Sequence, residues 1–206
     1  MNYIENIYIC LVAPILISIL SLRGRGRPMM IFVFSGMTAC LLSSYISTFV
    51  AAMAGMDYTT ASITVTPVVE ELMKLLPTLF YLLIFEPKRR DIPFCPIMIA
   101  VGFATLENVC YLVQNGSDQF FNLLIRGFGT GTMHMFCGSL TFVGIVFFWD
   151  KLWLRIVGTF GLLATAITYH GIYNMLVLQP GTVSYIGYLI PLVSVTLCAL
   201  WYNRES

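Results

Sequence analysis

The chain has 206 residues, of which 58% are hydrophobic and only 10% are charged. Soluble domains carry about 25% charged residues, so this composition excludes an ordinary soluble globule and indicates a protein embedded in lipid. The formal net charge is +1, and no basic run is interleaved with aromatic residues, so nucleic acid is not an expected partner.

Seven apolar stretches are long enough to cross the hydrocarbon core of a bilayer, which is about 30 Å thick. In chain order they span residues 6–22, 29–55, 66–86, 93–113, 120–148, 154–177 and 185–202. The connections between them are too short to hold a soluble domain. The sequence therefore predicts an all-α, polytopic helix bundle with about seven transmembrane helices, forming a single integral membrane domain over residues 1–206 in the cell membrane.

The loops between these stretches differ in charge according to the side on which they lie. Nine of the eleven Lys and Arg residues fall on one side, in the segments 23–27, 88–90 and 151–155 and at position 204. The loops on the opposite side hold no basic residue. Because Lys and Arg are retained on the cytoplasmic side, the sequence predicts an outer N-terminus and a cytoplasmic C-terminus.

A few ionisable residues lie inside the predicted spans, where each is costly unless it is paired or faces an internal cavity. At 1.5 Å of rise per residue, four of them from four different stretches lie roughly 21 to 24 Å above the cytoplasmic edge. These four are Glu70, Glu107, His134 and His170. Their common depth predicts one cavity in the outer half of the bilayer, where the acids and imidazoles meet.

Other polar residues share helix faces with these four. Lys74 follows Glu70 by four residues and Glu71 by three, so either carboxylate can pair with the ammonium group. Asn174 lies four residues after His170, so one helix face offers an imidazole and a carboxamide. Coupled carboxylates and imidazoles can supply a general base for water, and donors such as these can stabilise an oxyanion. The set predicts hydrolysis of an acyl bond.

The order of these residues resembles a known family. Glu70, Glu71 and Lys74 form an EExxK motif, Phe103 and Glu107 form FxxxE followed by Asn108, and His134 and His170 lie where two later histidine motifs belong. This combination resembles the PrsW proteases, which are membrane relatives of the CAAX prenyl endopeptidases and of bacteriocin-processing proteins. The resemblance covers the third to the sixth stretch and places the catalytic core at residues 66–177.

The resemblance implies a peptidase that cleaves a single-span, membrane-anchored substrate, with site-1-type cleavage of an anti-sigma factor as the expected reaction. It implies Glu70 as general base with Glu71 beside it, and His134 as the residue that binds water or orients the acids. His170 and Asn174 would stabilise the oxyanion, and Lys74, Phe103 and Asn108 would support the site. Glu107 stands where the CAAX enzymes have a histidine.

Metal dependence is left open by the sequence. Glutamates and histidines can hold zinc, and Glu70, Glu107, His134 and His170 would be its ligands. No HExxH motif is present, however, and the lysine after Glu70 would compete with a cation for the carboxylates. We therefore expect a metal-free glutamate mechanism without a cofactor, in which activity survives chelation, and keep zinc as the alternative.

Several simpler interpretations compete with this one. The paired glutamates and Lys74 can form a structural ion pair near the outer interface, and the histidines can serve as packing residues. Arg126 is expected to be an interfacial anchor, and the glycines 127, 129 and 131 to permit close helix approach or a kink. Two other functions remain, a non-catalytic scaffold of the same superfamily and a proton- or cation-coupled transporter.

Overall fold

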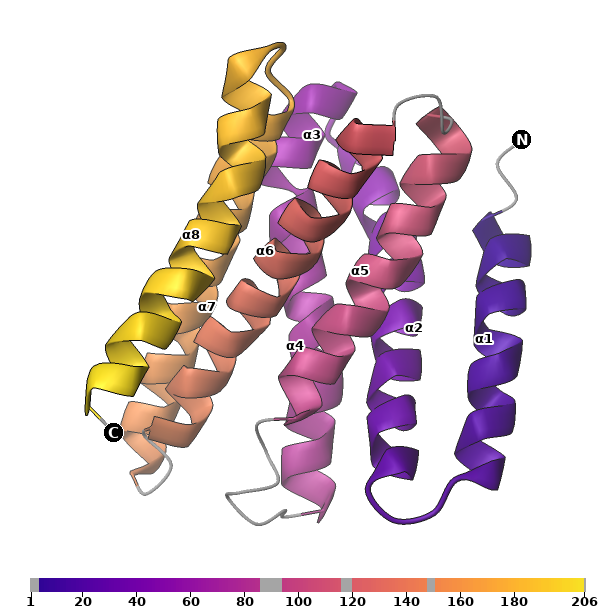
Figure 1. Cartoon of the computed structure of the whole chain (residues 1–206), viewed down its shortest axis with the longest axis vertical. Coiled ribbons are helices and arrows are strands. Elements are labelled where there is room, and N and C mark those ends of the chain that lie inside the picture. Colours follow the sequence, from indigo (N-terminus) through magenta and orange to yellow (C-terminus); the bar gives the residue numbers. More distant parts are fainter. Residues whose placement is uncertain (1–3, 86–93, 116–119, 148–150, 206) are drawn as a thin grey trace.

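The computed structural model of the chain describes residues 4–85, 94–115, 120–147 and 151–205. Within these residues the chain forms eight helices and no strand (Figure 1), which confirms the predicted all-α class. The helices are α1 (Ile4–Ser21), α2 (Gly26–Met53), α3 (Tyr58–Thr64), α4 (Thr66–Phe85), α5 (Phe94–Asn115), α6 (Phe120–Phe147), α7 (Leu152–Val177) and α8 (Thr182–Glu205).

The seven long helices coincide with the seven predicted stretches to within a few residues at each end. Residues 86, 93 and 148, at predicted helix ends, and the basic residues 88–90 lie outside the described residues. The short helix α3 was not predicted. It precedes α4 and is too short to show a helical period in the sequence.

Four of the described helices are long and apolar enough to cross a membrane, namely α1, α2, α7 and residues 94–114 of α5. The apolar part of α8 is shorter and runs from Thr182 to Cys198. Neither α4, which carries Glu70, Glu71 and Lys74, nor α6 is among these four. The four apolar helices support a multi-pass membrane protein, while the count of seven spans and the orientation of the termini stay predictions.

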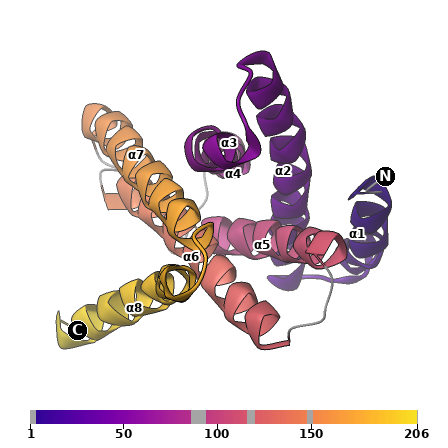
Figure 2. The same ribbon diagram turned by 90° about the horizontal axis from the view of Figure 1, so that it is seen from above.

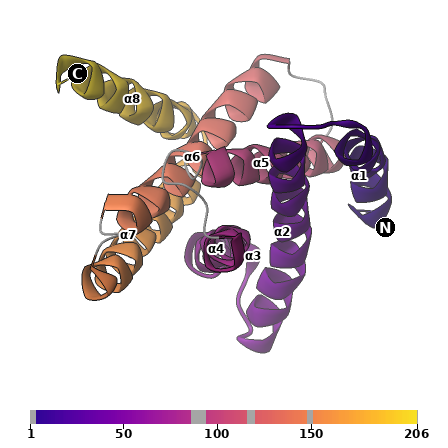
Figure 3. The same ribbon diagram turned by 90° about the horizontal axis from the view of Figure 1, so that it is seen from below.

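The helices are arranged around α6 and α5. Seen from above, α6 lies between α5, α7 and α8, while α3 and α4 lie between α2 and α7 (Figure 2). The view from below shows α4 in the same position (Figure 3). The turn between α1 and α2 lies at the same end of the bundle as the C-terminus, and the N-terminus lies at the other (Figure 1). This arrangement places α4 in contact with α5, α6 and α7, the helices that carry the other candidate site residues.

The closest helix contact joins α2 to α5 and depends on two glycines. A Cβ atom added to Gly36 would lie 2.0 Å from the carbonyl oxygen of Ile99, and one added to Gly102 would lie 2.0 Å from that of Val33. No side chain fits at these distances, so the two helix backbones touch here, as small residues allow in membrane helix pairs. This contact fixes α5, and with it Glu107, relative to the N-terminal half of the chain.

Helix α3 covers the same end of the bundle as the start of α4. Its first turn is capped by Asp57, whose Oδ1 atom accepts a hydrogen bond from the backbone N–H of Thr60 at 3.0 Å. Hydrogen bonds from the Thr60 side chain and backbone lower the pKa of the Asp57 carboxyl. The helix packs on α7, where a Cβ atom at Gly171 would lie 3.0 Å from the Ile63 carbonyl oxygen.

Candidate active site

Four helices bring the predicted residues to one place in the bundle. Helix α4 carries the glutamate pair and the lysine, and α5, α6 and α7 each carry one further residue. The rings of His134 and His170 lie 5.2 Å apart between centroids and are nearly perpendicular, at 87°. The predicted meeting of acids and imidazoles in one cluster is confirmed.

Lys74 forms an ion pair with only one of the two glutamates that precede it on α4. Its Nζ atom donates to Oε1 of Glu71 at 2.6 Å and to Nδ1 of His134 at 3.0 Å. The side chains of Lys74 and Glu71 are only 5% and 2% exposed, so the pair is enclosed by protein. A buried ion pair of this kind needs further hydrogen bonds to offset the loss of water around both charges. The two histidines supply them.

His170 completes the surroundings of Glu71. Its Nδ1–H group donates to Oε1 of Glu71 at 2.7 Å. A carboxylate can only accept, so this contact assigns the ring proton to Nδ1 and leaves a lone pair on Nε2. The Nε2 atom lies 3.7 Å from Oε2 of Glu70. His170 therefore presents its free nitrogen to the first glutamate of the motif.

His134 is held from both sides. Because the Lys74 ammonium donates to Nδ1, the ring proton of His134 lies on Nε2, which donates to Oε2 of Glu107 at 2.5 Å. Phe103 packs against the ring at 4.9 Å between centroids, and the Lys74 ammonium lies 5.0 Å from the centre of the same phenyl ring. The FxxxE motif thus gives the His134 ring an apolar packing surface from Phe103 and an anionic hydrogen-bond acceptor from Glu107.

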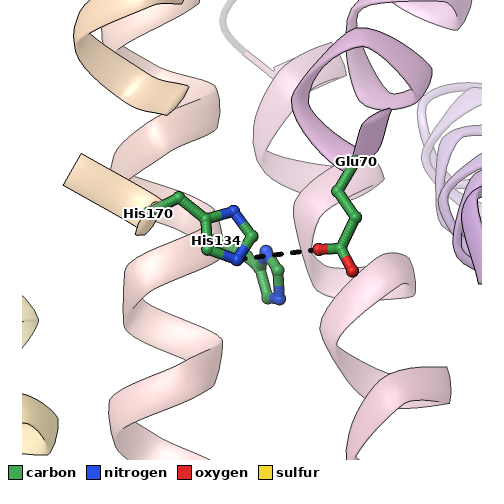
Figure 4. Close-up of side chains that lie close together, drawn as sticks. All are labelled: Glu70, His134 and His170. Carbon is green, nitrogen blue, oxygen red and sulfur yellow. Dashed lines mark ion pairs between the residues drawn. The ribbon is translucent and has the colours of Figure 1, made fainter. Parts of the chain in front are cut away.

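Glu70 differs from the other two acids of the cluster. Figure 4 shows its carboxylate reaching from α4 toward both imidazole rings. Its Oε2 atom is buried and has no hydrogen-bond partner among the described residues, whereas Glu71 and Glu107 each have two partners. A buried acceptor without a partner is rare and needs an explanation, such as a catalytic role or a bound ion or water.

The exposed fractions of the side chains distinguish a more exposed side of the cluster from a buried side. The side chains of Glu107 and Glu70 are 29% and 13% exposed, whereas His134 is fully buried. Glu71 and Lys74 are almost as enclosed as His134. The cluster is therefore most exposed at Glu107 and Glu70, while Glu71, Lys74 and His134 are enclosed by protein.

Asn174 lies one turn after His170 and has a structural contact. Its Nδ2 atom donates to the backbone carbonyl of Ser62 in α3 at 2.9 Å. This bond uses one of the two amide hydrogens and ties α3 to α7. The other amide hydrogen remains for the predicted oxyanion role, which no contact in the structure tests.

Arg126 is the functional neighbour that sequence reasoning missed. It was expected to be an interfacial anchor, but its guanidinium donates to Oε1 of Glu107 at 3.2 Å and to the side-chain oxygen of Asn108. The available signal was its position, two helical turns before His134 on α6. The burial of Glu107 could not be read from that spacing, so the pairing was not predicted.

Of the glycines at positions 127, 129 and 131 of α6, only one makes the predicted close approach. A Cβ atom at Gly129 would lie 2.9 Å from the Tyr188 carbonyl oxygen of α8. Nothing lies within 4 Å of such an atom at Gly127 or Gly131, and α6 is continuous through all three positions. The expectation of close approach is therefore confirmed at Gly129 alone.

The residues present fit a metal ion. Glu70, His134 and His170 each offer one ligand atom, and these atoms lie within 4.8 Å of one another. Zinc bonds of about 2.0–2.1 Å place two ligands of a tetrahedral site about 3.3 Å apart, close to the 3.7 Å between Glu70 Oε2 and His170 Nε2. Two histidines and one glutamate are a known zinc ligand set.

Two further contacts bear on the metal question. Lys74 pairs with Glu71, so it does not neutralise Glu70, and the objection raised from the sequence loses its force. Both ring nitrogens of His134 are engaged, so one of its two contacts, with Lys74 or with Glu107, would give way to the ion. Glu107, the fourth ligand of the predicted zinc set, pairs with His134 and Arg126 instead.

Comparison with known proteins supports the predicted resemblance. A family model described as PrsW family intramembrane metalloprotease matches residues 26–200, which include every residue of the cluster. No curated protein and no solved structure shows a significant match. The family description and the Glu70, His134 and His170 cluster leave the expectation of a metal-free site without support. The chain is a multi-pass membrane protein and belongs to the PrsW family of intramembrane proteases.

Proposed function

We propose that this protein hydrolyses a peptide bond of a single-span membrane protein with a water molecule activated at Glu70. The observation that carries the proposal is the buried Oε2 atom of Glu70, which has no hydrogen-bond partner among the described residues, unlike the carboxylates of Glu71 and Glu107. A general base must keep a lone pair free for the proton that it removes. The carboxylates of Glu71 and Glu107 already accept hydrogen bonds from cationic side chains or imidazole rings.

The proposed reaction begins with a water between Glu70 and His170. The facing atoms of these residues are 3.7 Å apart, which is too long for a direct hydrogen bond and allows both to contact the same water. Glu70 removes a proton from this water as the water oxygen attacks the scissile carbonyl carbon. The same carboxyl group then gives the proton to the leaving amine, so the base is regenerated.

The other residues hold this geometry. Glu71 fixes the tautomer and orientation of His170, and Lys74 prevents Glu71 from turning toward the water. We propose that His134, held by Glu107, forms the opposite wall of the site. The free amide hydrogen of Asn174 is the proposed donor to the oxyanion, which matches the role that the family resemblance gives it.

A metal ion is the proposed cofactor, with zinc as the candidate. Glu70, His134 and His170 would hold it, and it would lower the pKa of a bound water and polarise the scissile carbonyl. The support is the family description together with the spacing of these three residues. Glu70 is then essential for two reasons, as a ligand and as the group next to the water.

We expect the purified protein to contain about one zinc per chain and to lose activity on chelation, with recovery when zinc is returned. Metal analysis before and after dialysis against a chelator, with the cleavage rate measured in parallel, checks this expectation. Glu70→Gln is expected to lower the metal content. Glu5→Gln is the matched control, since Glu5 bonds Tyr45 outside the site. Full activity in metal-free protein would instead support a glutamate mechanism without an ion.

The proposed substrate is an anti-sigma factor cut on its outer side. Glu70 lies about one turn from the start of α4, and His170 lies two turns before the end of α7, so the site is near the end of the bundle that is opposite the C-terminus. With the orientation predicted from the basic loops, this end faces outward. A site-1 cut of this kind agrees with what the family resemblance implies.

Cleavage of a single-span reporter by purified protein in lipid separates this proposal from its alternatives. If the protein is a scaffold, the reporter stays intact with the unaltered protein and with every glutamate variant. A transporter would move ions or protons across the vesicle membrane without cutting the reporter. We favour the protease because Oε2 of Glu70, which has no hydrogen-bond partner among the described residues, faces Nε2 of His170 at 3.7 Å.

A further inference from the structure

We infer that Arg126 is a positioning residue of the active site, which orients Glu107 so that this carboxylate can hold His134. The inference rests on the proposed function and concerns a residue outside the EExxK, FxxxE and histidine motifs. Arg126 lies on α6, eight residues before His134. It acts through Glu107 and does not itself reach the reacting atoms.

Three residues of α5 hold the guanidinium group of Arg126. Glu107 accepts a hydrogen bond from NH2 at 3.2 Å, and Asn108 accepts one from NH1. The ring of Tyr111 lies 3.6 Å from the guanidinium carbon, which is stacking distance for a cation–π contact. These three residues lie within five positions of one helix, so the planar guanidinium matches a surface built on one turn of α5.

This arrangement does not resemble a lipid anchor. An arginine that anchors a helix at the interface extends its charged end into water or toward headgroups. The side chain of Arg126 is only 12% exposed, and its charged end contacts residues of the neighbouring helix. The contact between Arg126 and Glu107 is therefore made inside the protein, next to the more exposed side of the cluster.

The contact divides the two oxygens of Glu107 between two partners. Oε1 accepts from Arg126, while Oε2 accepts from Nε2 of His134 at 2.5 Å. Glu107 is 29% exposed, so without Arg126 one oxygen would be free to turn toward the opening of the site. The carboxylate would then lose its fixed direction toward the imidazole. Residues that orient the direct ligands of a site typically change affinity or activity by 10–100-fold when replaced.

The kinetic test compares Arg126→Gln with Arg126→Lys in lipid, using a single-span peptide reporter. We expect kcat to fall about 10–100-fold in the Gln variant while KM changes by less than about twofold. The Lys variant keeps the charge without the two-pronged geometry and should recover part of the loss. Tyr185→Phe is the matched control, because it removes a 3.1 Å hydrogen bond from Tyr185 to Asn122, four residues before Arg126 on α6, and leaves the contacts of Arg126 with α5 in place.

A second measurement reports on His134 without any substrate. The chain has only two histidines, so selective labelling with ¹⁵N-histidine gives the ring signals of His134 and His170 alone. We expect Arg126→Gln to shift the ring signals of His134 and to leave those of His170 near their positions in the unaltered protein. Tyr185→Phe should move neither.

The two measurements separate failure of this inference from failure of the proposed function. Unchanged kcat, or unchanged His134 signals in a folded Arg126→Gln protein, overturns the positioning role. If the Gln and Lys variants showed the same loss of kcat as each other and the same loss of melting temperature, Arg126 would contribute to packing alone. This result would also overturn the positioning role. A reporter left intact by the unaltered protein would contradict the proposed protease, while the histidine signals would still test the link from Arg126 to His134.

Discussion

Glu70→Gln should reduce the rate of peptide cleavage by about 10²–10⁴-fold, the range expected for loss of a positioned general base. The substitution keeps the size of the side chain and removes its ability to take a proton. Because Oε2 of Glu70 has no hydrogen-bond partner among the described residues, the change breaks no hydrogen bond at this atom and removes only the 3.7 Å ion pair with His170. The melting temperature of the variant should therefore stay close to that of the unaltered protein.

Glu5→Gln serves again as the control for loss of a carboxylate, since Glu5 accepts a hydrogen bond from Tyr45 on the far side of the bundle. It should leave the cleavage rate unchanged. Single-turnover rates on a membrane-embedded reporter measure the effect on both variants. Activity of Glu70→Gln within about tenfold of the unaltered protein would show that another group activates the water.

Lys74→Met should destabilise the fold by about 3–5 kcal/mol, the cost of leaving one partner of a buried ion pair alone. The substitution removes the cation from Glu71, which is 2% exposed, and the hydrogen bond to Nδ1 of His134. It also frees His134 from one of its two contacts. Thermal or denaturant unfolding in detergent measures the loss of stability.

Lys151→Met is the matched control, because Lys151 is exposed at the start of α7. It should change stability by no more than about 0.5 kcal/mol. The double variant Glu71→Leu with Lys74→Met removes both charges and should regain stability without regaining activity. Equal stability of the Lys74→Met and Lys151→Met variants would show that the ion pair is not a structural element of the bundle.

The long helices were predictable because each is a long apolar run, and short loops separate these runs. The prediction failed for α3, whose seven residues are too few to show a period, although Asp57 and Thr60 form a capping pair that marks its start. The contact between Gly36 and the backbone of α5 was also beyond the sequence. Such contacts depend on which helices are neighbours, and one helix alone does not specify its partner.

The residue types of the site were predictable from depth and spacing, but their pairing was not. Positions three and four residues apart both face Lys74, so the sequence left open which glutamate it joins, and the structure shows Glu71. That choice leaves Oε2 of Glu70 without a hydrogen-bond partner among the described residues and removes the argument against a metal ion. The sequence predicts an interfacial anchor at Arg126, whereas its charged end contacts Glu107 and Tyr111 of α5.

The most direct test of the account is to map the bond that the purified protein cuts in a single-span reporter reconstituted in lipid. Mass spectrometry of the products should show one cut in the outer half of the span or at its outer edge, because the cluster around Glu70 lies toward the end of the bundle that the basic loops predict to face outward. The cut should be absent with Glu70→Gln. A cut at the cytoplasmic edge, or the same products from Glu70→Gln, would contradict an active site at this cluster.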